Sequence, residues 1–219
     1  MWHINPNLVS RNYIGTQARI KGKFDSNTYS TFFGDICPKF FGWIVPESES
    51  IARVGLADLK NPNTLYDNLI FKECNNAQLI ERNGGLIPIY NTKTKFSKDN
   101  SIYIVGDAAG MVKATTGGGL VQGFEGVKIL VDVIENGSNY RKKLSSLRKD
   151  LWASLFIRKM LNKMKNRDYD DLIAIMNDSK VKKIMKEVSR DNPIKLITRL
   201  FFAKPQLAGF VKLFFRWII

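Results

Sequence analysis

A glycine-rich turn between a short apolar run and a long amphipathic segment constrains the fold of this sequence more than any other feature. Residues 101–105 form the apolar run, residues 106–119 contain five glycines, and residues 120–134 carry apolar side chains at helical spacing. Asn136 and Gly137 then supply a helix stop. The order predicts a strand, a glycine loop and a helix.

Three consecutive glycines, Gly117, Gly118 and Gly119, stand directly before Leu120 at the start of the predicted helix. Glycine lets the backbone approach a ligand, and the N–H groups and dipole at a helix N-terminus favour an anion or an electron-rich oxygen. Asp107 follows the predicted strand, where open α/β folds place ligand-contacting side chains, and its carboxylate can accept hydrogen bonds from ribose or ribitol hydroxyls. On glycine content alone, a plain turn in which Asp107 caps a local N–H is the alternative.

The string over residues 106–129, GDAAGMVKATTGGGLVQGFEGVKI, resembles the second flavin fingerprint of the FAD-dependent geranylgeranyl reductases. That family includes the archaeal digeranylgeranylglycerophospholipid reductases. The resemblance implies that Asp107 holds the flavin ribitol and that the backbone of residues 117–120 runs along the phosphate and isoalloxazine end. Related aromatic hydroxylases share the Gly-Asp start but commonly have His in place of Gly110 and Pro in place of Ala114, so the reductase match is the more specific one.

A second block, residues 37–46, resembles the family's aromatic signature, in which Tyr, Trp, Phe and Pro alternate and a Gly-x-Gly follows. Phe41, Trp43 and Val45 lie at period two on one face of a predicted strand, and Gly55 has the expected spacing. An aromatic surface of this kind would bind an isoprenoid chain, because burying apolar surface away from water is favourable. Phe41 replaces the family's Tyr, so a polar role of that hydroxyl is not carried over. Ordinary packing in the core of the sheet is the alternative.

The remaining pattern divides the chain into segments. Aromatic and β-branched runs up to residue 57 predict antiparallel strands, residues 64–79 predict a helix, and residues 80–90 predict a hairpin or a bulged strand. The predicted fold class is α+β. It combines an antiparallel substrate-binding sheet over residues 1–95, the C-terminal part of an FAD-binding α/β domain over residues 96–140, and a basic helical region over residues 141–219.

The first half of a dinucleotide fold is missing from the pattern. Such folds begin with a strand, a Gly-x-Gly-x-x-Gly turn and a helix that bind the ADP half of FAD, but this sequence has no glycines at that spacing. A truncated fragment, a chain that pairs with a separately made N-terminal half, and a degenerate relative without flavin are the three explanations. We favour the paired chain, because the predicted strand over residues 101–105 would otherwise lack sheet neighbours.

Positive charge is concentrated in the last third, where residues 141–219 carry 20 Lys and Arg against 7 Asp and Glu. Residues 194–203 and 206–219 are short apolar segments, each with a basic pair four positions apart, and no run is long enough to span a bilayer. This pattern predicts peripheral contact of residues 194–219 with the cytoplasmic membrane face. A terminal helix buried against protein is the alternative, and the absence of a recognised module argues against nucleic acid.

Several function classes are disfavoured by composition. His3 is the single histidine, which excludes multi-histidine metal sites and argues against a Ser-His-Asp hydrolase. Cys37 and Cys74 lack metal spacing and suit packing in a reducing cytoplasm, although Cys37 can also line the prenyl pocket. The resemblance implies an oxidoreductase that transfers hydride from reduced FAD to isoprenoid double bonds. A non-catalytic, membrane-associated or partner-binding subunit is the competing interpretation.

Overall fold

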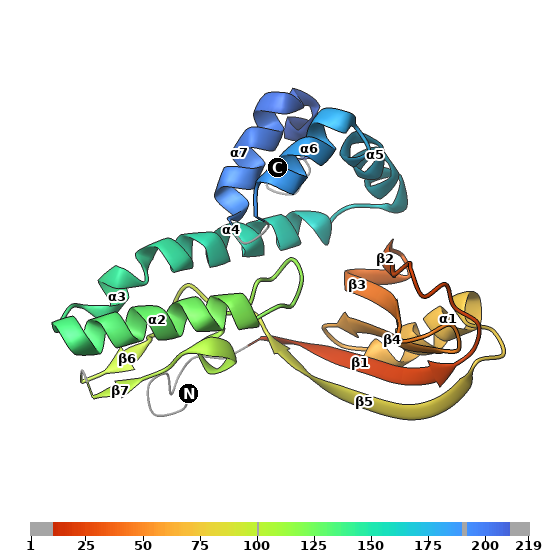
Figure 1. The fold of residues 1–219 in the computed structure, drawn as a ribbon, viewed down its shortest axis with the longest axis horizontal. Coiled ribbons are helices and arrows are strands. Elements are labelled where there is room, and N and C mark those ends of the chain that lie inside the picture. The colour runs from red at the N-terminus through yellow and green to blue at the C-terminus, as the bar shows by residue number, and fades with distance from the viewer. Residues whose placement is uncertain (1–10, 100, 190–191, 211–219) are drawn as a thin grey trace. The chain divides into compact units, whose positions relative to one another are not determined.

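The computed structural model describes residues 11–99, 101–189 and 192–210, which fall into two compact units (Figure 1). We call them the sheet unit and the helical unit. The sheet unit comprises residues 12–87 and 164–170. The helical unit comprises the described parts of residues 88–163 and 171–219, together with Arg11.

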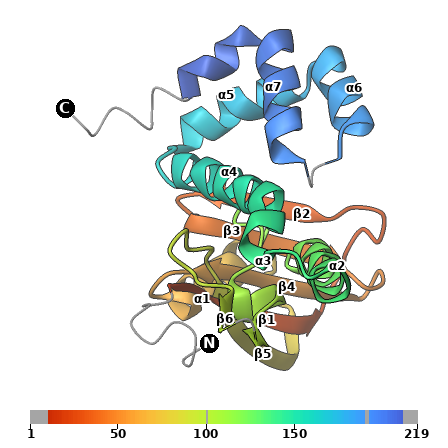
Figure 2. The ribbon, with the colours of Figure 1, turned by 90° about the vertical axis from the view of Figure 1, so that its left-hand side faces the viewer.

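The sheet unit is built on five strands in the order β2-β3-β4-β1-β5, which can be followed from top to bottom in Figure 2. Their bounds are β1 Asn12–Lys21, β2 Ser30–Gly34, β3 Cys37–Pro46, β4 Ile51–Asp58 and β5 Gln78–Pro88. The pairs β2–β3, β3–β4 and β1–β4 are antiparallel. The predicted antiparallel sheet and the α+β fold class are therefore confirmed.

One face of this sheet is covered by α1, Pro62–Glu73. Phe40, Val54 and Leu56 point to that face and are at most 1% exposed. Leu69 of α1 is fully buried, and it approaches Gly42 so closely that a Cβ added there would lie 3.2 Å from its Cδ2. Each large side chain buried in this way contributes about 1.5–3 kcal/mol.

The segment after α1 differs from the sequence prediction. The helix predicted over residues 64–79 ends at Glu73, because Asn76 takes a left-handed φ of 66° and Gln78 already begins β5. Residues 80–90 form no hairpin, since β5 runs unbroken to Pro88. The helix also begins at Pro62, two residues before the predicted start, because proline is favoured in the first turn, where its missing N–H would have no partner.

The helical unit begins with the predicted strand, loop and helix. β6, Ser97–Lys98, pairs with β7, Ile102–Tyr103, and a 3-10 turn, η1, follows at Gly106–Ala109. α2 spans Leu120–Asn136 and ends at Gly137 in the left-handed conformation, as the sequence predicts. β7 is shorter than the predicted strand. It also has β6 as a neighbour, so the expectation that this strand lacks one was wrong.

The helices that follow are α3 Tyr140–Lys143, α4 Ser145–Leu161, α5 Asn166–Met176, α6 Ser179–Glu187 and α7 Pro193–Ala203, with a short η2 at Pro205–Leu207. The sequence predicts breaks near residues 166–168, 191–193 and 204–205, and the last two are confirmed. The first lies at residues 162–165, and a further break precedes α6, where Asp178 accepts hydrogen bonds from the N–H groups of Lys180 and Val181.

Across the described ranges, no helix is long and apolar enough to cross a bilayer.

Candidate functional site

The glycine loop opens with a tight reversal of the chain. Gly106 and Gly110 both have φ of 66°, a conformation that carries no Cβ penalty for glycine. The N–H of Gly110 donates to the carbonyl of Asp107 at 2.9 Å, and the N–H of Met111 donates to the carbonyl of Gly106 at 3.0 Å. The reversal leaves Asp107 exposed in η1, four residues after the end of β7.

The second part of the loop returns the chain to the same place. The N–H of Lys113 donates to the carbonyl of Gly118 at 2.9 Å, and the N–H of Gly117, which has φ of 71°, donates to the carbonyl of Lys113 at 2.8 Å. Gly119 then lies against the carboxylate of Asp107, which a Cβ at position 119 would strike. The loop therefore brings together the predicted carboxylate and the predicted glycines.

A cavity of about 300 Å³ opens beside this contact. It is lined by Val105, Gly106, Asp107, Gly119, Leu120, Gly123, Phe124 and Val127. Gly119 precedes the first turn of α2, and no described side chain caps that turn. The first N–H groups of a helix have no partner within it, and the helix dipole adds positive potential there. One surface thus offers both donors for an anion and a carboxylate that accepts from hydroxyls.

Two buried side chains of α4 hold the loop from behind. Arg158 is 1% exposed; its Nε donates to the carbonyl of Ala114 at 3.0 Å and its Nη2 to the carbonyl of Thr115 at 2.5 Å. The hydroxyl of Ser154 accepts from the N–H of Thr115 at 3.1 Å. A buried guanidinium is costly unless its donors are satisfied, so these bonds tie α4 firmly to the loop. Sequence reasoning missed both residues, although Leu147, Leu151, Ser154 and Arg158 share one face of the predicted helical region.

α2 approaches the strand and the loop most closely at Gly126. Gln122, Gly126 and Val133 are its buried positions. A Cβ at Gly126 would lie 2.6 Å from the sulfur of Met111 and 2.9 Å from Cγ2 of Val105, so the helix approaches the strand and loop because it has no side chain there. Val133, Ile129 and Leu130 of α2 also pack against the core of this unit.

Other large apolar residues of α2 are exposed. Leu120 is 79% exposed, Phe124 is 67% exposed and Ile134 is 66% exposed, with Val121, Val127 and Val131 between 43% and 47%. They follow the apolar spacing that the sequence shows, but described residues leave this face open to solvent. We call Leu120, Val121, Phe124, Val127, Val131 and Ile134 the α2 apolar face.

The aromatic residues predicted for the prenyl site lie on the face of the sheet opposite to α1. Trp43 stands opposite Gly55 in the β3–β4 register, and its indole N–H donates to Oε1 of Gln17 at 2.9 Å. A Cβ at Gly55 would lie 2.6 Å from the indole ring and 2.8 Å from the carbonyl of Thr16. Gly55 is thus required for Trp43 to lie flat on the sheet.

The other members of this set differ in exposure. Phe41 is half-buried, with its ring centroid 5.7 Å from that of Trp43 and 5.9 Å from that of Phe33, whereas Val45 is 43% exposed. Cys37 is 1% exposed, and its thiol donates to the carbonyl of Ala57 at 3.4 Å. The structure brings Phe41, Trp43 and Gly55 together. Val45 lies farther along β3, near the end of the strand at Pro46.

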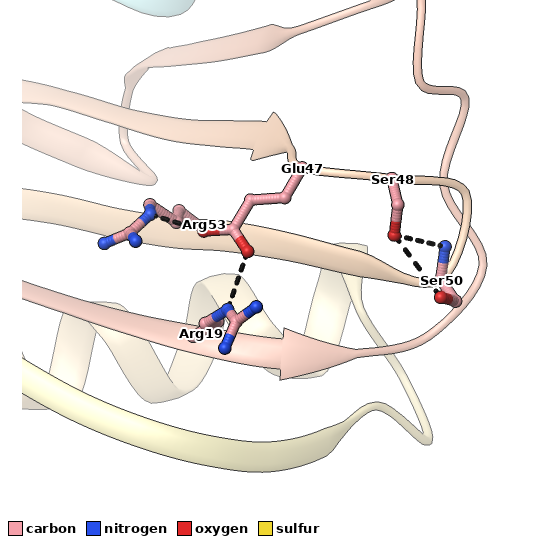
Figure 3. Close-up of polar contacts among 5 residues, drawn as sticks. All are labelled: Arg19, Glu47, Ser48, Ser50 and Arg53. Carbon is pink, nitrogen blue, oxygen red and sulfur yellow. Dashed lines mark hydrogen bonds and ion pairs between the residues drawn. The ribbon is translucent and has the colours of Figure 1, made fainter.

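Two arginines and a glutamate lie beside Val45 at this end of β3 (Figure 3). Arg53 is opposite Val45, and Arg19 is opposite Arg53. Glu47 accepts from Nε of Arg19 at 2.6 Å and from Nε of Arg53 at 2.7 Å, and the hydrogen bond from Arg19 lowers the pKa of this carboxyl below its ordinary value. Sequence reasoning missed this cluster, which leaves one positive charge in excess beside the aromatic residues.

Comparisons with known proteins agree with the motifs. No protein-family model matches the chain. It is 36% identical over 109 residues to a digeranylgeranylglycerophospholipid reductase of Methanothermobacter thermautotrophicus, a match that covers 47% of this chain and 27% of the relative. It is 32% identical over 184 residues to such a reductase of Methanosphaera stadtmanae, covering 76% of this chain and 44% of the relative.

Solved structures share the fold. A geranylgeranyl bacteriochlorophyll reductase-like protein of Thermoplasma acidophilum superimposes with a TM-score of 0.71 at 19% identity, over 94% of this chain and 56% of that protein. A flavin-dependent brominase variant gives a TM-score of 0.54 at 12% identity, over 80% of this chain and 50% of that protein.

The chain therefore has an α+β fold similar to that of a geranylgeranyl reductase-like protein. It is a homologue of the digeranylgeranylglycerophospholipid reductases, so the resemblance to the geranylgeranyl reductase family is confirmed. The chain spans less than half of the length of the curated relatives that it matches, and this partial coverage fits a C-terminal half.

Proposed function

We propose that this chain contributes the flavin-ribitol side and the prenyl-binding sheet of an FAD-dependent enzyme that reduces isoprenoid double bonds in membrane lipid biosynthesis. The observation that carries the proposal is the approach of the Asp107 carboxylate to Gly119 at the uncapped start of α2, beside the 300 Å³ cavity. Homology to reductases named for geranylgeranyl lipids supports the substrate class.

The residues around the cavity fit part of an FAD molecule. Asp107 would accept hydrogen bonds from ribitol hydroxyls, and the N–H groups at the start of α2 would face phosphate or the electron-rich edge of the ring. Gly119 keeps the space between them free of a side chain. When bound, FAD supplies the hydride for the reduction. Arg158 and Ser154 would hold the loop in place while the ligand binds.

An N-terminal half supplied by another polypeptide would complete the site. The α2 apolar face supports this part of the proposal, because Leu120 and Phe124 line the cavity and are exposed, and the apolar spacing continues to Ile134. A row of exposed large apolar side chains of this kind is typical of an interface. The relatives provide further sequence for such a half, since the matches cover 27% and 44% of their lengths.

The sheet unit would hold the isoprenoid chain. Phe41 and Trp43 offer half-buried aromatic surface, and Gly55 leaves room for the indole. The Arg19 and Arg53 guanidiniums at the end of this surface would attract an anionic headgroup, although Glu47 already occupies one donor of each.

Peripheral membrane contact through residues 194–219 is also part of the proposal. Within the described residues of this segment, Ile194 and Phe202 are 46% and 84% exposed, and Lys195 is exposed beside them. Arg199 pairs with Glu187 at 3.2 Å, which ties one predicted lipid-binding cation to α6. Lys212 and Arg216 lie outside the described residues. Flotation of the assembled protein with anionic vesicles at low salt tests this contact, and failure to float would remove it.

Co-expression of the chain with the N-terminal half of a homologous reductase tests the catalytic proposal. We expect a yellow complex that binds FAD. Supplied with dithionite as the reductant, it should raise the mass of a geranylgeranyl phospholipid by two units per reduced double bond. The chain expressed alone should be colourless. A stable flavoprotein from the single chain would refute the pairing, and a complex without flavin or reduction would favour the non-catalytic subunit.

A further inference from the structure

A second cavity lies in the helical unit, apart from the one beside Asp107. It has a volume of about 360 Å³, which falls within the range of small-molecule sites. Its walls come from α4, α6, α7, η2 and the part of α5 that belongs to this unit. All of the lining residues from these elements are apolar, and Pro193, Leu200 and Leu207 are buried among them.

The walls suit a flexible hydrocarbon. Met160 from α4, Met176 from α5 and Met185 from α6 all line the cavity. Methionine side chains adapt to irregular shapes, and an apolar space of this size binds apolar groups rather than ordered water. Left empty, the walls would lose favourable contacts. The chemistry of the cavity therefore favours an apolar chain.

The polar residues of the cavity all come from one segment. Lys113, Thr115 and Thr116 belong to the glycine loop and line the cavity together. Thr115 is held there by Ser154, and the ammonium of Lys113 adds positive charge. The charge complements a ligand with an anionic head and an apolar tail.

We propose that this cavity binds the chain of a phosphorylated isoprenoid, with the phosphate beside Lys113 and Thr116. The proposal rests on the isoprenoid chemistry of the proposed function and adds a second chain-binding site, in a different unit from Phe41 and Trp43.

Photo-labelling of the full-length chain locates the ligand directly. The probe is geranylgeranyl diphosphate with an aryl azide at the far end of the chain, and labelled peptides are identified by mass spectrometry. We expect label on peptides from α4 and α7, competed by geranylgeranyl diphosphate but not by inorganic diphosphate. Ile197→Trp fills the cavity from α7 and should reduce the label at least fivefold.

Ile194→Trp is the matched control, because Ile194 lies on the same helix, is 46% exposed and does not line the cavity. Its labelling should equal that of the unaltered chain. Leu161→Trp, which fills the cavity from α4, should repeat the effect of Ile197→Trp, and both variants are compared by circular dichroism to show that they are folded. Lys113→Gln should weaken binding of the diphosphate by about two- to fivefold and leave binding of geranylgeraniol unchanged.

Absence of label in this cavity, or equal labelling of the filled variants and the unaltered chain, would overturn the proposal. If residues 211–219 or a second copy of the chain occupied the cavity, no label would appear there. Flavin binding and lipid reduction by the assembled protein are measured separately, so failure of this site is distinguishable from failure of the proposed function.

Discussion

β3 and α2 each carry large apolar side chains on one face, but the two units use these faces in opposite ways. In the sheet unit, Phe40 of β3 is 1% exposed and its ring centroid lies 4.7 Å from that of Tyr13. In the helical unit, Phe124 of α2 is 67% exposed, while Gly126 on the opposite side touches Met111. An apolar pattern therefore identifies a face, and the positions of small residues decide whether that face is packed within the chain.

The largest expected effect comes from comparing these two phenylalanines. Phe40→Ala removes a fully buried ring and should lower the free energy of unfolding by about 3–5 kcal/mol. Phe124→Ala should change it by no more than about 0.5 kcal/mol, because the ring is exposed in the chain alone. Urea denaturation of the two variants measures both values, and similar losses would contradict the described burial.

Arg158→Met should cost about 2–3 kcal/mol, because the carbonyls of Ala114 and Thr115 lose a charged donor. Lys159→Met, at the exposed neighbouring position of α4, is the control and should be close to neutral. Hydrogen exchange of the glycine loop should accelerate only in the first variant. Unchanged exchange there would show that Arg158 does not position the loop.

Gly126→Val should destabilise the chain by about 2 kcal/mol, since a branched side chain would collide with Met111 and Val105. Glu125→Val introduces the same side chain one position earlier, where the residue is exposed. The free energies of unfolding of the two variants, measured together, test which side of α2 is packed. The assignment fails if the Glu125 variant is the more damaged.

Gly55→Ala should give the smallest loss, about 1 kcal/mol, because the methyl group would displace the Trp43 ring and meet the Thr16 carbonyl. Trp43 fluorescence should shift at the same time. Gly85→Ala is the control, since nothing lies within 4 Å of a Cβ added there. An unperturbed Trp43 in the Gly55 variant would contradict the close contact.

Local features were predictable from the sequence. The strand, glycine loop and helix are marked by Gly106, Gly119 and Gly137, and aromatic and β-branched runs identify strands of the sheet up to residue 57. The sequence also named Asp107 and the loop glycines as residues of one site, and the structure places the Asp107 carboxylate against Gly119. Their roles toward flavin stay a prediction. These predictions need only short-range chain geometry.

Contacts between distant segments were not predictable in this way. Arg158 and Ala114 are 44 positions apart, and Arg19 reaches Glu47 across 28 positions. Local periodicity does not predict either contact, because each depends on which elements pack together. The end of α1 was missed for a different reason, namely that Asn76 takes a left-handed conformation that a helical pattern does not reveal.

The central claim is that Asp107 and the start of α2 form one side of an FAD site. Titration of FAD into the assembled protein, followed by flavin fluorescence, tests it most directly. Asp107→Ala should weaken binding at least tenfold, or about 1.4 kcal/mol. Asp171→Ala, an exposed carboxylate of α5 in the same unit, should bind FAD as the unaltered protein does. Equal affinity of the Asp107 variant and the unaltered protein would contradict the account.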